Sequence, residues 1–394
     1  MAPSPSTGEG WGEGGVSFRK PVPYNAAMPT QHLPYNGEDL GPHPHVAVIF
    51  RDQIGDFLIA TPLMRGLRER FPGLTLDYLG GDRTRELEEA SRLVDSRYSL
   101  FGSAEDSGLA SYLDMRRTAA GPYDLALNLE FDRRAAEASA MTRARYVVGA
   151  SLDADGEPRV IHPGAPIDRL WADMRWNRAD LQVDYPELRS SYIGEIFCQL
   201  ARVETDSART EAPVADPPMP IPALLLCTGA NRSAKLWPNA HWSALAEWIE
   251  SSGLTAGLLG AAPGPGNRYQ TGGVDEALIA SGVIDLRGKL TLPEVAGALR
   301  LASVLVTVDS GLMHLAAAVD ATTVALFGAS PQRLWAPASR AVRIIEPSNP
   351  CSACEDNRFK NPDCLLPIHQ CMLSVEPERV IAEVERILSQ RCAT

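Results

Sequence analysis

Short apolar runs alternate with helical stretches in two consecutive series, and this pattern restricts the possible folds most strongly. The first series has candidate strands at 46–51, 74–79, 97–101, 124–129 and 145–149, with helical stretches at 61–71, 84–92, 107–119 and 132–142. The second has candidate strands at 223–228, 254–260, 283–286, 303–308 and 322–327. Because parallel strands need a crossover helix, the alternation predicts two doubly wound α/β domains.

The boundaries of these domains follow from composition. A segment with five prolines at 206–222 reads as a linker between an N-terminal domain at 45–205, which closes with a helix near 189–203, and a C-terminal domain at 223–375. A final helix within 376–394 has one apolar face and is expected to pack on the domains. A length of 394 residues also favours two domains.

Residues 1–44 are rich in proline and glycine without helical or strand periodicity, and they predict a disordered tail. They lack the basic start and apolar core of a secretory signal. No apolar run reaches the ~20 residues that span a bilayer, so a cytoplasmic, soluble protein is expected, with association to the inner face of the membrane left open. A net charge of −12 argues against nucleic-acid binding.

A strand-to-helix junction near the C-terminal end predicts an anion site. The run 304–308 is followed by Asp309, Ser310 and Gly311, where a helix begins. The first N–H groups of a helix lack intrahelical partners and favour negative charge, so the amides of Ser310, Gly311 and Leu312, with the side chain of His314, suit a diphosphate. The simpler alternative is a helix cap without further function.

A second junction of this kind follows the first predicted strand, where Gly55 and Asp56 lie in a turn. Ligands of open α/β sheets bind at the carboxyl ends of the strands, so Asp56 is a candidate for chemistry. Thr61 and Pro62 form a typical helix start, with Thr as N-cap and Pro at the first position. If the helix begins there, Asp56 is free for chemistry; the simpler alternative is that Asp56 only caps a helix.

Four blocks in order resemble glycosyltransferase family 9, the heptosyltransferases of lipopolysaccharide core assembly, over roughly residues 45–390. They are RDQIGDFLIATPLMRGLRERFP at 51–72, TGANRSAKLWPNAHWSALAEWI at 228–249, LRGKLTLPEVAGALRLASVLVTVDSGLMHLAAA at 286–318 and VALFGASPQRLWAP at 324–337. The resemblance implies the GT-B fold, in which two Rossmann-like domains face a central cleft. It also implies inverting transfer of a heptose or related sugar from a nucleoside diphosphate to an acceptor hydroxyl.

The reaction divides into three tasks. Asp56 matches the family's catalytic aspartate and would take the proton of the acceptor hydroxyl. Asp309 would hold the donor sugar. Lys235, which matches the lysine of the family's K-x-W-P element, would stabilise the leaving diphosphate with the helix start at 310–314 and the turn at Thr228 and Gly229. A fixed ammonium and a helix dipole make a catalytic metal or other cofactor unnecessary. Without the resemblance, Lys235 reads as a solvated surface lysine.

The residues that would recognise the two substrates depart from the family pattern. The family has an acid soon after the glycine that ends the strand at 254–260, but here no acid occurs before Asp275. ADP is the first expectation for the nucleotide, with UDP and GDP open. For the acceptor, a set of residues in the N-terminal half suits sugars or acidic groups. The simpler alternatives are that the Glu130 carboxylate serves a helix start and that the aromatic side chains pack in a core. These residues are Gly55, Glu130, Arg133, Trp171, Arg175 and Trp176, with Glu130 also a second candidate base.

Four cysteines with the spacing C-x2-C-x9-C-x6-C lie near the C-terminus: Cys351, Cys354, Cys364 and Cys371. Such a set is compatible with structural zinc, with disulfides or with reduced thiols.

The acceptor itself is not fixed by the residues. A glycan, a lipid-linked saccharide or a small molecule of secondary metabolism all remain candidates, in a monomer or weak dimer. Two other functions remain open: a sugar-nucleotide epimerase of the same fold, which would need no acceptor, and a non-catalytic scaffold that binds a sugar nucleotide.

Overall fold

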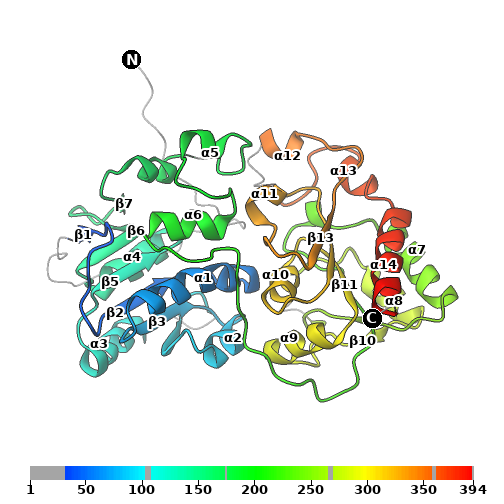
Figure 1. Cartoon of the computed structure of the whole chain (residues 1–394), viewed down its shortest axis with the longest axis horizontal. Coiled ribbons are helices and arrows are strands. Elements are labelled where there is room, and N and C mark those ends of the chain that lie inside the picture. Colours follow the sequence, from blue (N-terminus) through cyan, green and yellow to red (C-terminus); the bar gives the residue numbers. More distant parts are fainter. Residues whose placement is uncertain (1–31, 103–107, 174, 265–268, 357–360, 393–394) are drawn as a thin grey trace. The chain divides into compact units, whose positions relative to one another are not determined.

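A computed structural model describes residues 32–102, 108–173, 175–264, 269–356 and 361–392. The chain divides into two compact units, each with its own sheet (Figure 1). Unit 1 comprises the chain up to residue 190 together with 194–207, and unit 2 comprises 191–193 and everything from residue 208 onward. Unit 2 therefore takes up most of the expected linker at 206–222. In that segment, the amide of Ala215 donates to the carbonyl of Pro293 at 2.9 Å.

Unit 1 contains a seven-stranded sheet in the order β1-β6-β5-β2-β3-β4, with β7 antiparallel to β6 and the other pairs parallel. Its strands are β1 (Leu33–Pro34), β2 (His45–Ile49), β3 (Thr75–Gly80), β4 (Ser96–Ser99), β5 (Leu125–Asn128), β6 (Tyr146–Leu152) and β7 (Pro158–Ile161). Its helices are α1 (Ile54–Arg70), α2 (Arg85–Ala90), α3 (Leu109–Ala120), α4 (Arg133–Thr142), the 3-10 helix η2 (Pro166–Trp171), α5 (Leu181–Asp184) and α6 (Ile193–Leu200), whose first residue falls in unit 2.

The expectation of a disordered tail over residues 1–44 is wrong for residues 32–44. There β1 pairs with β6, and Tyr35 is buried with its ring edge-on to Tyr146. The imidazole of His32 also contacts the carbonyl of Ala144 at 2.8 Å. A local apolar cluster thus overrides the proline-rich composition, while residues 1–31 of the predicted tail lie outside the described residues.

Helix α1 begins at Ile54, so the alternative start at Thr61 is wrong and Pro62 lies inside the helix. Proline has no N–H for the carbonyl four residues earlier, which is that of Leu58. The hydroxyl of Thr61 donates to this carbonyl at 2.7 Å and thereby replaces the missing bond. Asp56 consequently lies in the first turn of α1.

Unit 2 contains a six-stranded parallel sheet in the order β10-β9-β8-β11-β12-β13. Its strands are β8 (Leu224–Cys227), β9 (Ala256–Leu258), β10 (Ile284–Asp285), β11 (Val304–Val308), β12 (Thr323–Leu326) and β13 (Val342–Ile345). Its helices are the 3-10 helix η3 (Ser233–Lys235), α7 (Asn239–Ser251), α8 (Val274–Ala280), α9 (Leu292–Leu301), α10 (Gly311–Ala318), α11 (Gln332–Trp335), α12 (Ala353–Asp356), α13 (Gln370–Leu373) and α14 (Pro377–Cys392).

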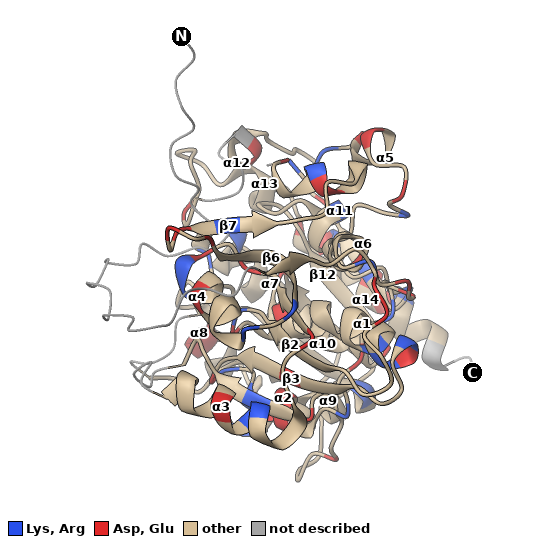
Figure 2. Cartoon of the chain, turned by 90° about the vertical axis from the view of Figure 1, so that its left-hand side faces the viewer, with Lys and Arg blue, Asp and Glu red and all other residues tan. Residues whose placement is uncertain are grey.

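The C-terminal helix α14 packs within unit 2. Its residues Val380, Val384 and Ile387 are buried in the same apolar cluster as Trp237 and Trp242. Within the described residues, no helix is both long enough and apolar enough to cross a membrane. Both signs of charge occur along surface helices such as α3, as Figure 2 shows.

Strand order locates a switch point in each sheet. In unit 1 the chain reverses direction across the sheet between β2 and β5, and in unit 2 between β8 and β11. The crevice at the carboxyl ends of such strands is where open α/β sheets bind ligands. The turns to consider are therefore those after β2 and β5 in unit 1, and those after β8 and β11 in unit 2.

Candidate active site

In unit 2, the turn after β11 forms as the sequence predicts. All five residues of β11 are buried, and α10 starts at Gly311 with Ser310 in the N-cap position. The Ser310 hydroxyl lies 3.0 Å from that of Thr307, and its side chain does not cap the helix. The first amides of α10, including those of Gly311 and Leu312, therefore provide donors for an anion.

Lys235 lies across from this turn. It ends η3, which follows β8 through the turn at Thr228 and Gly229, and its ammonium lies 3.1 Å from Oδ2 of Asp309. Burial by itself would raise the pKa of Asp309, but the ammonium of Lys235 and further hydrogen bonds leave it below the ordinary value. The Lys235 side chain is 15 % exposed. The reading as a solvated surface lysine is therefore wrong.

The tryptophan of the K-x-W-P element is anchored in the core of unit 2. Trp237 is buried, and its indole N–H donates to the carbonyl of Val375 at 2.7 Å. Its ring also packs edge-on against Trp242 at 4.9 Å between centroids. Lys235, two residues earlier, is thus attached to a rigid part of the core.

His314 completes this group from the first turns of α10. It is 5 % exposed, and its Nδ1 has no hydrogen-bond partner in the described part of the chain. Burial lowers the pKa of His314 to about 4, and the nearby Lys235 adds to this effect while Asp309 opposes it. The imidazole is neutral at pH 7, so it offers a hydrogen bond without a positive charge.

Arg232 is a residue that sequence reasoning missed. It is buried in the loop before Lys235, and its guanidinium donates to the carbonyl of Ala329 at 3.1 Å and to the hydroxyl of Ser330 at 3.0 Å. Ser330 in turn hydrogen bonds Asp309. Arg232 therefore ties the loop after β8 to the segment after β12. Its pairing depends on residues about a hundred positions away, so no local pattern could have identified it.

In unit 1, the predicted residues gather around an ion-pair cluster. Arg51, directly after β2, contacts both carboxylate oxygens of Glu130 at 3.2 Å and Asp132 at 2.9 Å. Glu130 and Asp132 follow β5, so the cluster bridges the two sides of the switch point. Asp56 and the buried Gly55 belong to the first turn of α1, and the charge of Asp56 acts on Arg51.

The Glu130 carboxyl differs from an ordinary surface acid. It is 7 % exposed, and burial raises its pKa to about 7 although Arg51 opposes the shift. The helix-start role belongs instead to Asp132, whose side chain accepts from the amide of Ala135 at 2.9 Å at the N-cap of α4.

The other predicted acceptor residues do not form one site. Trp171 and Trp176 are buried and contact the ring of Phe131, and the Trp176 indole N–H donates to the carbonyl of Leu170 at 2.8 Å. Packing accounts for both tryptophans, so their expected contact with acceptor is not supported. Arg175 is exposed, and Arg133 forms a surface ion pair with Glu157 at 2.8 Å.

Three of the C-terminal cysteines affect the pKa of the fourth, Cys371. All four are free thiols, with Cys354 and Cys371 buried, and burial raises the pKa of Cys371 to about 12 with further contributions from Cys351, Cys354 and Cys364. Among the described residues, no three His, Cys, Asp or Glu side chains are grouped so as to hold a metal ion.

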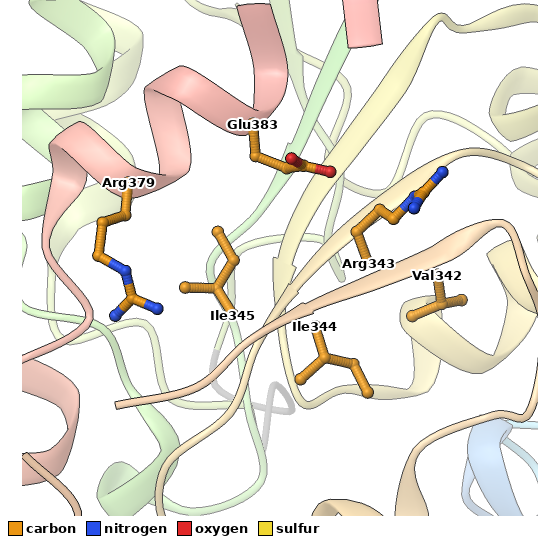
Figure 3. A pocket seen from close by; sticks show the side chains of 6 residues that line it. All are labelled: Val342, Arg343, Ile344, Ile345, Arg379 and Glu383. Carbon is orange, nitrogen blue, oxygen red and sulfur yellow. The ribbon is translucent and has the colours of Figure 1, made fainter. Parts of the chain in front are cut away.

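A hollow of about 390 Å³ lies elsewhere in unit 2, along β13 and α14 (Figure 3). Arg343, Arg379 and Glu383 line it together with Val342, Ile344 and Ile345. The Arg379 guanidinium donates to the carbonyl of Glu346 at 2.9 Å, and Glu383 pairs with Arg386 at 2.6 Å. None of the predicted site residues lines this hollow.

Comparison with known proteins finds similarity to heptosyltransferases. The sequence profile of glycosyltransferase family 9 (heptosyltransferase) matches residues 189–363. Lipopolysaccharide heptosyltransferase 2 of Salmonella typhimurium is 29% identical over 174 residues, which cover 43% of this chain and 47% of that protein. Lipooligosaccharide heptosyltransferase 2 of Haemophilus influenzae is 23% identical over 379 residues, which cover 88% of this chain and 100% of that protein. The chain is therefore similar to the heptosyltransferases of glycosyltransferase family 9.

Solved structures agree on the fold. ADP-heptose lps heptosyltransferase II of E. coli has a TM-score of 0.63 at 19% identity, covering 88% of this chain and 99% of that one. The iron-containing dodecameric glycosyltransferase TibC of enterotoxigenic E. coli has a TM-score of 0.53 at 16% identity, covering 92% of this chain and 80% of that one. The predicted GT-B fold with two Rossmann-like domains is confirmed.

Proposed function

We propose that this chain is a glycosyltransferase of family 9 and that it transfers a heptose from ADP-heptose to an acceptor hydroxyl with inversion at the anomeric carbon. The observation that supports this most strongly is the arrangement of Lys235, Asp309 and His314 at the switch point of unit 2. It lies beside the start of α10, where a diphosphate finds backbone donors.

Unit 2 would hold the donor. The amides of Ser310, Gly311 and Leu312 and the ammonium of Lys235 face the diphosphate, and the Asp309 carboxylate accepts hydrogen bonds from the sugar hydroxyls. As the anomeric bond breaks, negative charge grows on the leaving diphosphate, and donors fixed in advance stabilise that charge without reorganising. A bound cation is not needed for this step.

Unit 1 would supply the base. The acceptor hydroxyl attacks the anomeric carbon, its oxygen forms the new glycosidic bond, and its proton passes to the carboxylate of Asp56. An aspartate is a weak base for an alcohol, so the proton moves within the transition state, which typically contributes about 10²- to 10⁴-fold to the rate. Glu130 and Arg51 line the same switch point and are proposed to contact the acceptor.

The acceptor class is proposed from the family alone. Relatives named for lipopolysaccharide and lipooligosaccharide suggest a saccharide hydroxyl, and the reaction would then take place in the cytoplasm at the inner face of the membrane. A small-molecule acceptor of secondary metabolism is the other option, in a monomer or weak dimer.

The test compares Asp56→Asn with the parent chain, with ADP-heptose as donor and a heptose-deficient lipopolysaccharide core as acceptor. Transfer should fall by at least about 10²-fold, while the dissociation constant for ADP stays within threefold. NMR of the parent product should show the inverted anomer. Undiminished transfer by Asp56→Asn would refute the base, and a heptose-nucleotide isomer formed without acceptor would favour an epimerase. ADP binding without any transfer by the parent would favour a scaffold.

For the cysteines we propose a structural role outside the chemistry, as reduced thiols. All four are free, and among the described residues no three His, Cys, Asp or Glu side chains are grouped so as to hold a metal ion. Thiol titration of the unfolded, unreduced chain should find no disulfide, and elemental analysis should find no bound zinc or iron. A disulfide, or about one zinc or iron per chain that is lost in Cys354→Ser, would contradict the proposal.

A further inference from the structure

A buried carboxylate outside the predicted site links two turns at the carboxyl edge of the unit 2 sheet. Asp275 lies in the first turn of α8 and is 7 % exposed. It is the first acid after the end of β9. In this chain both oxygens of Asp275 bind other protein groups.

One oxygen of Asp275 accepts a hydrogen bond from the turn after β8. The Thr228 hydroxyl donates to Oδ1 of Asp275 at 2.5 Å, and Thr228 is itself 2 % exposed. Thr228 opens the loop that leads to Lys235, so this bond acts at the root of the donor loop. A hydroxyl has one proton, and here that proton is committed to the carboxylate.

The other oxygen of Asp275 accepts a hydrogen bond from Arg287, which follows β10. The Arg287 Nη1 contacts Oδ2 of Asp275 at 3.1 Å. Asp285 holds the same guanidinium through contacts of 2.9 Å and 3.0 Å, and Glu276 adds a contact of 3.0 Å. The arginine is therefore fixed in orientation. Its positive charge compensates the cost of burying the Asp275 carboxylate.

The donor loop is thus attached at two points. Thr228 is held by Asp275 at the beginning, and Arg232 is held by Ala329 and Ser330 further along. Between them, Ala230 exchanges two backbone hydrogen bonds with Gln270 at 3.0 Å and 2.8 Å. Lys235 follows three residues after Arg232, so its placement opposite Asp309 depends on both attachments.

We propose that Asp275, oriented by Arg287, is a positioning residue for donor binding: it fixes the loop from Thr228 to Lys235 and does not itself contact the nucleotide. The inference rests on the proposed function, because it requires that unit 2 bind a nucleoside diphosphate.

The experiment measures ADP binding by calorimetry, steady-state kinetics with ADP-heptose, and the thermal midpoint of the full chain. Asp275→Asn and Thr228→Val should each raise the dissociation constant of ADP and the KM for the donor by about tenfold, with kcat changed by less than threefold. Thr228→Ser, which keeps the hydroxyl, should lose less affinity than Thr228→Val. The double variant Thr228→Val/Asp275→Asn should be no weaker than Asp275→Asn, because both changes remove one interaction.

The matched control is Glu276→Gln. Glu276 is the neighbouring acid on α8 and pairs with the same arginine, but its side chain is 74 % exposed. Exposed pairs contribute little, so its ADP affinity should equal that of the parent.

Two results separate the possible failures. If the parent binds ADP and the variants lower only the thermal midpoint, with unchanged affinity at a temperature where all are folded, Asp275 is structural and the inference is wrong. If the parent binds no nucleoside diphosphate, the proposed function fails and the inference fails with it. Should Asp275→Asn not fold, the Thr228→Val and Thr228→Ser pair decides the question.

Discussion

At the scale of single residues, the donor group combines an ion pair with a neutral imidazole. Asp309 and Lys235 balance each other at 3.1 Å, so the site carries little net charge before the diphosphate enters. His314 adds a buried nitrogen without hydrogen-bond partner in the described part of the chain. Such a nitrogen is costly in the empty protein, and a ligand oxygen would satisfy it.

The burial of His314 makes the stability of the chain depend on pH. Its folded pKa of about 4 lies below the ordinary value of 6.5, so the unfolded chain binds more protons between these values. The free energy of unfolding should therefore fall as pH drops from 7 to 4.5, by roughly 2 kcal/mol from this group. Urea unfolding of the parent and of His314→Gln at both pH values measures the effect. An equal loss in the two proteins would mean that His314 is already protonated at pH 7 or accessible to water.

Sequence reasoning located Asp309 and His314 because they stand at a strand-to-helix junction, and Lys235 because it matches the lysine of the K-x-W-P element of glycosyltransferase family 9. It did not find Arg232 or Arg287, since their partners come from distant loops. It assigned Trp176 to the acceptor, although the ring fills the space beside Phe131 and Phe197. Whether an aromatic side chain faces a ligand or a core depends on tertiary packing, which the local sequence does not specify.

At the scale of elements, α1 shows how a local signal can mislead. Thr61 followed by Pro62 is a strong helix-start pattern, yet the helix runs through it because the Thr61 hydroxyl binds the carbonyl that proline leaves without a donor. The apolar residues on both sides of the proline are buried, and this burial favours continuation of the helix. Strand β13 was not predicted for a different reason. It lies at the edge of the sheet, and Arg343 interrupts its apolar pattern.

Replacing Thr61 by valine should therefore lower the free energy of unfolding by about 1 to 3 kcal/mol, because it leaves the buried Leu58 carbonyl without a partner. Denaturant unfolding measures the loss. The matched control is Thr118→Val in α3, where the hydroxyl donates to the carbonyl of Asp114 at 2.9 Å on an exposed surface and the next residue is Ala119. That change should cost less than about 0.5 kcal/mol. Equal costs at the two sites would contradict the assigned role of Thr61.

A buried polar cluster joins β2, β3 and α3 at the edge of the sheet opposite the proposed site. The carboxylate of Asp77 contacts the His45 imidazole at 2.9 Å, the Arg116 guanidinium at 2.8 Å and the Tyr123 hydroxyl at 2.7 Å. Burial alone would raise the pKa of Asp77, but these partners hold it below the ordinary value. We expect this cluster to stabilise unit 1.

Asp77→Asn should lower the free energy of unfolding by roughly 3 kcal/mol, because it leaves the largely buried Arg116 guanidinium without its compensating charge. Denaturant unfolding at pH 7 measures this loss, and ADP affinity should not change because the cluster belongs to unit 1. The control is Asp114→Asn, which breaks an ion pair whose carboxylate is 71 % exposed and should cost less than about 1 kcal/mol. A neutral effect of Asp77→Asn would show that the cluster does not stabilise the unit.

At the scale of the whole molecule, the two units have separate apolar cores and separate switch points. The alternation of strands and helices predicts this architecture because the crossover between two parallel strands of one sheet is almost always right-handed. Composition misplaced the boundaries, since residues 32–44 join unit 1 and most of the proline-rich linker joins unit 2. The family model also covers only residues 189–363, which is mainly the unit assigned to the donor.

The central claim is that unit 2 binds a nucleoside diphosphate through Lys235 opposite the start of α10. Isothermal titration of the full chain with ADP tests it, comparing the parent with Lys235→Met and with Arg300→Met, which removes an exposed positive charge from α9. We expect the parent and Arg300→Met to bind ADP equally and Lys235→Met to bind at least about tenfold more weakly, since a charge-assisted contact is lost. Equal affinity of all three proteins, or no binding by the parent, would contradict the account.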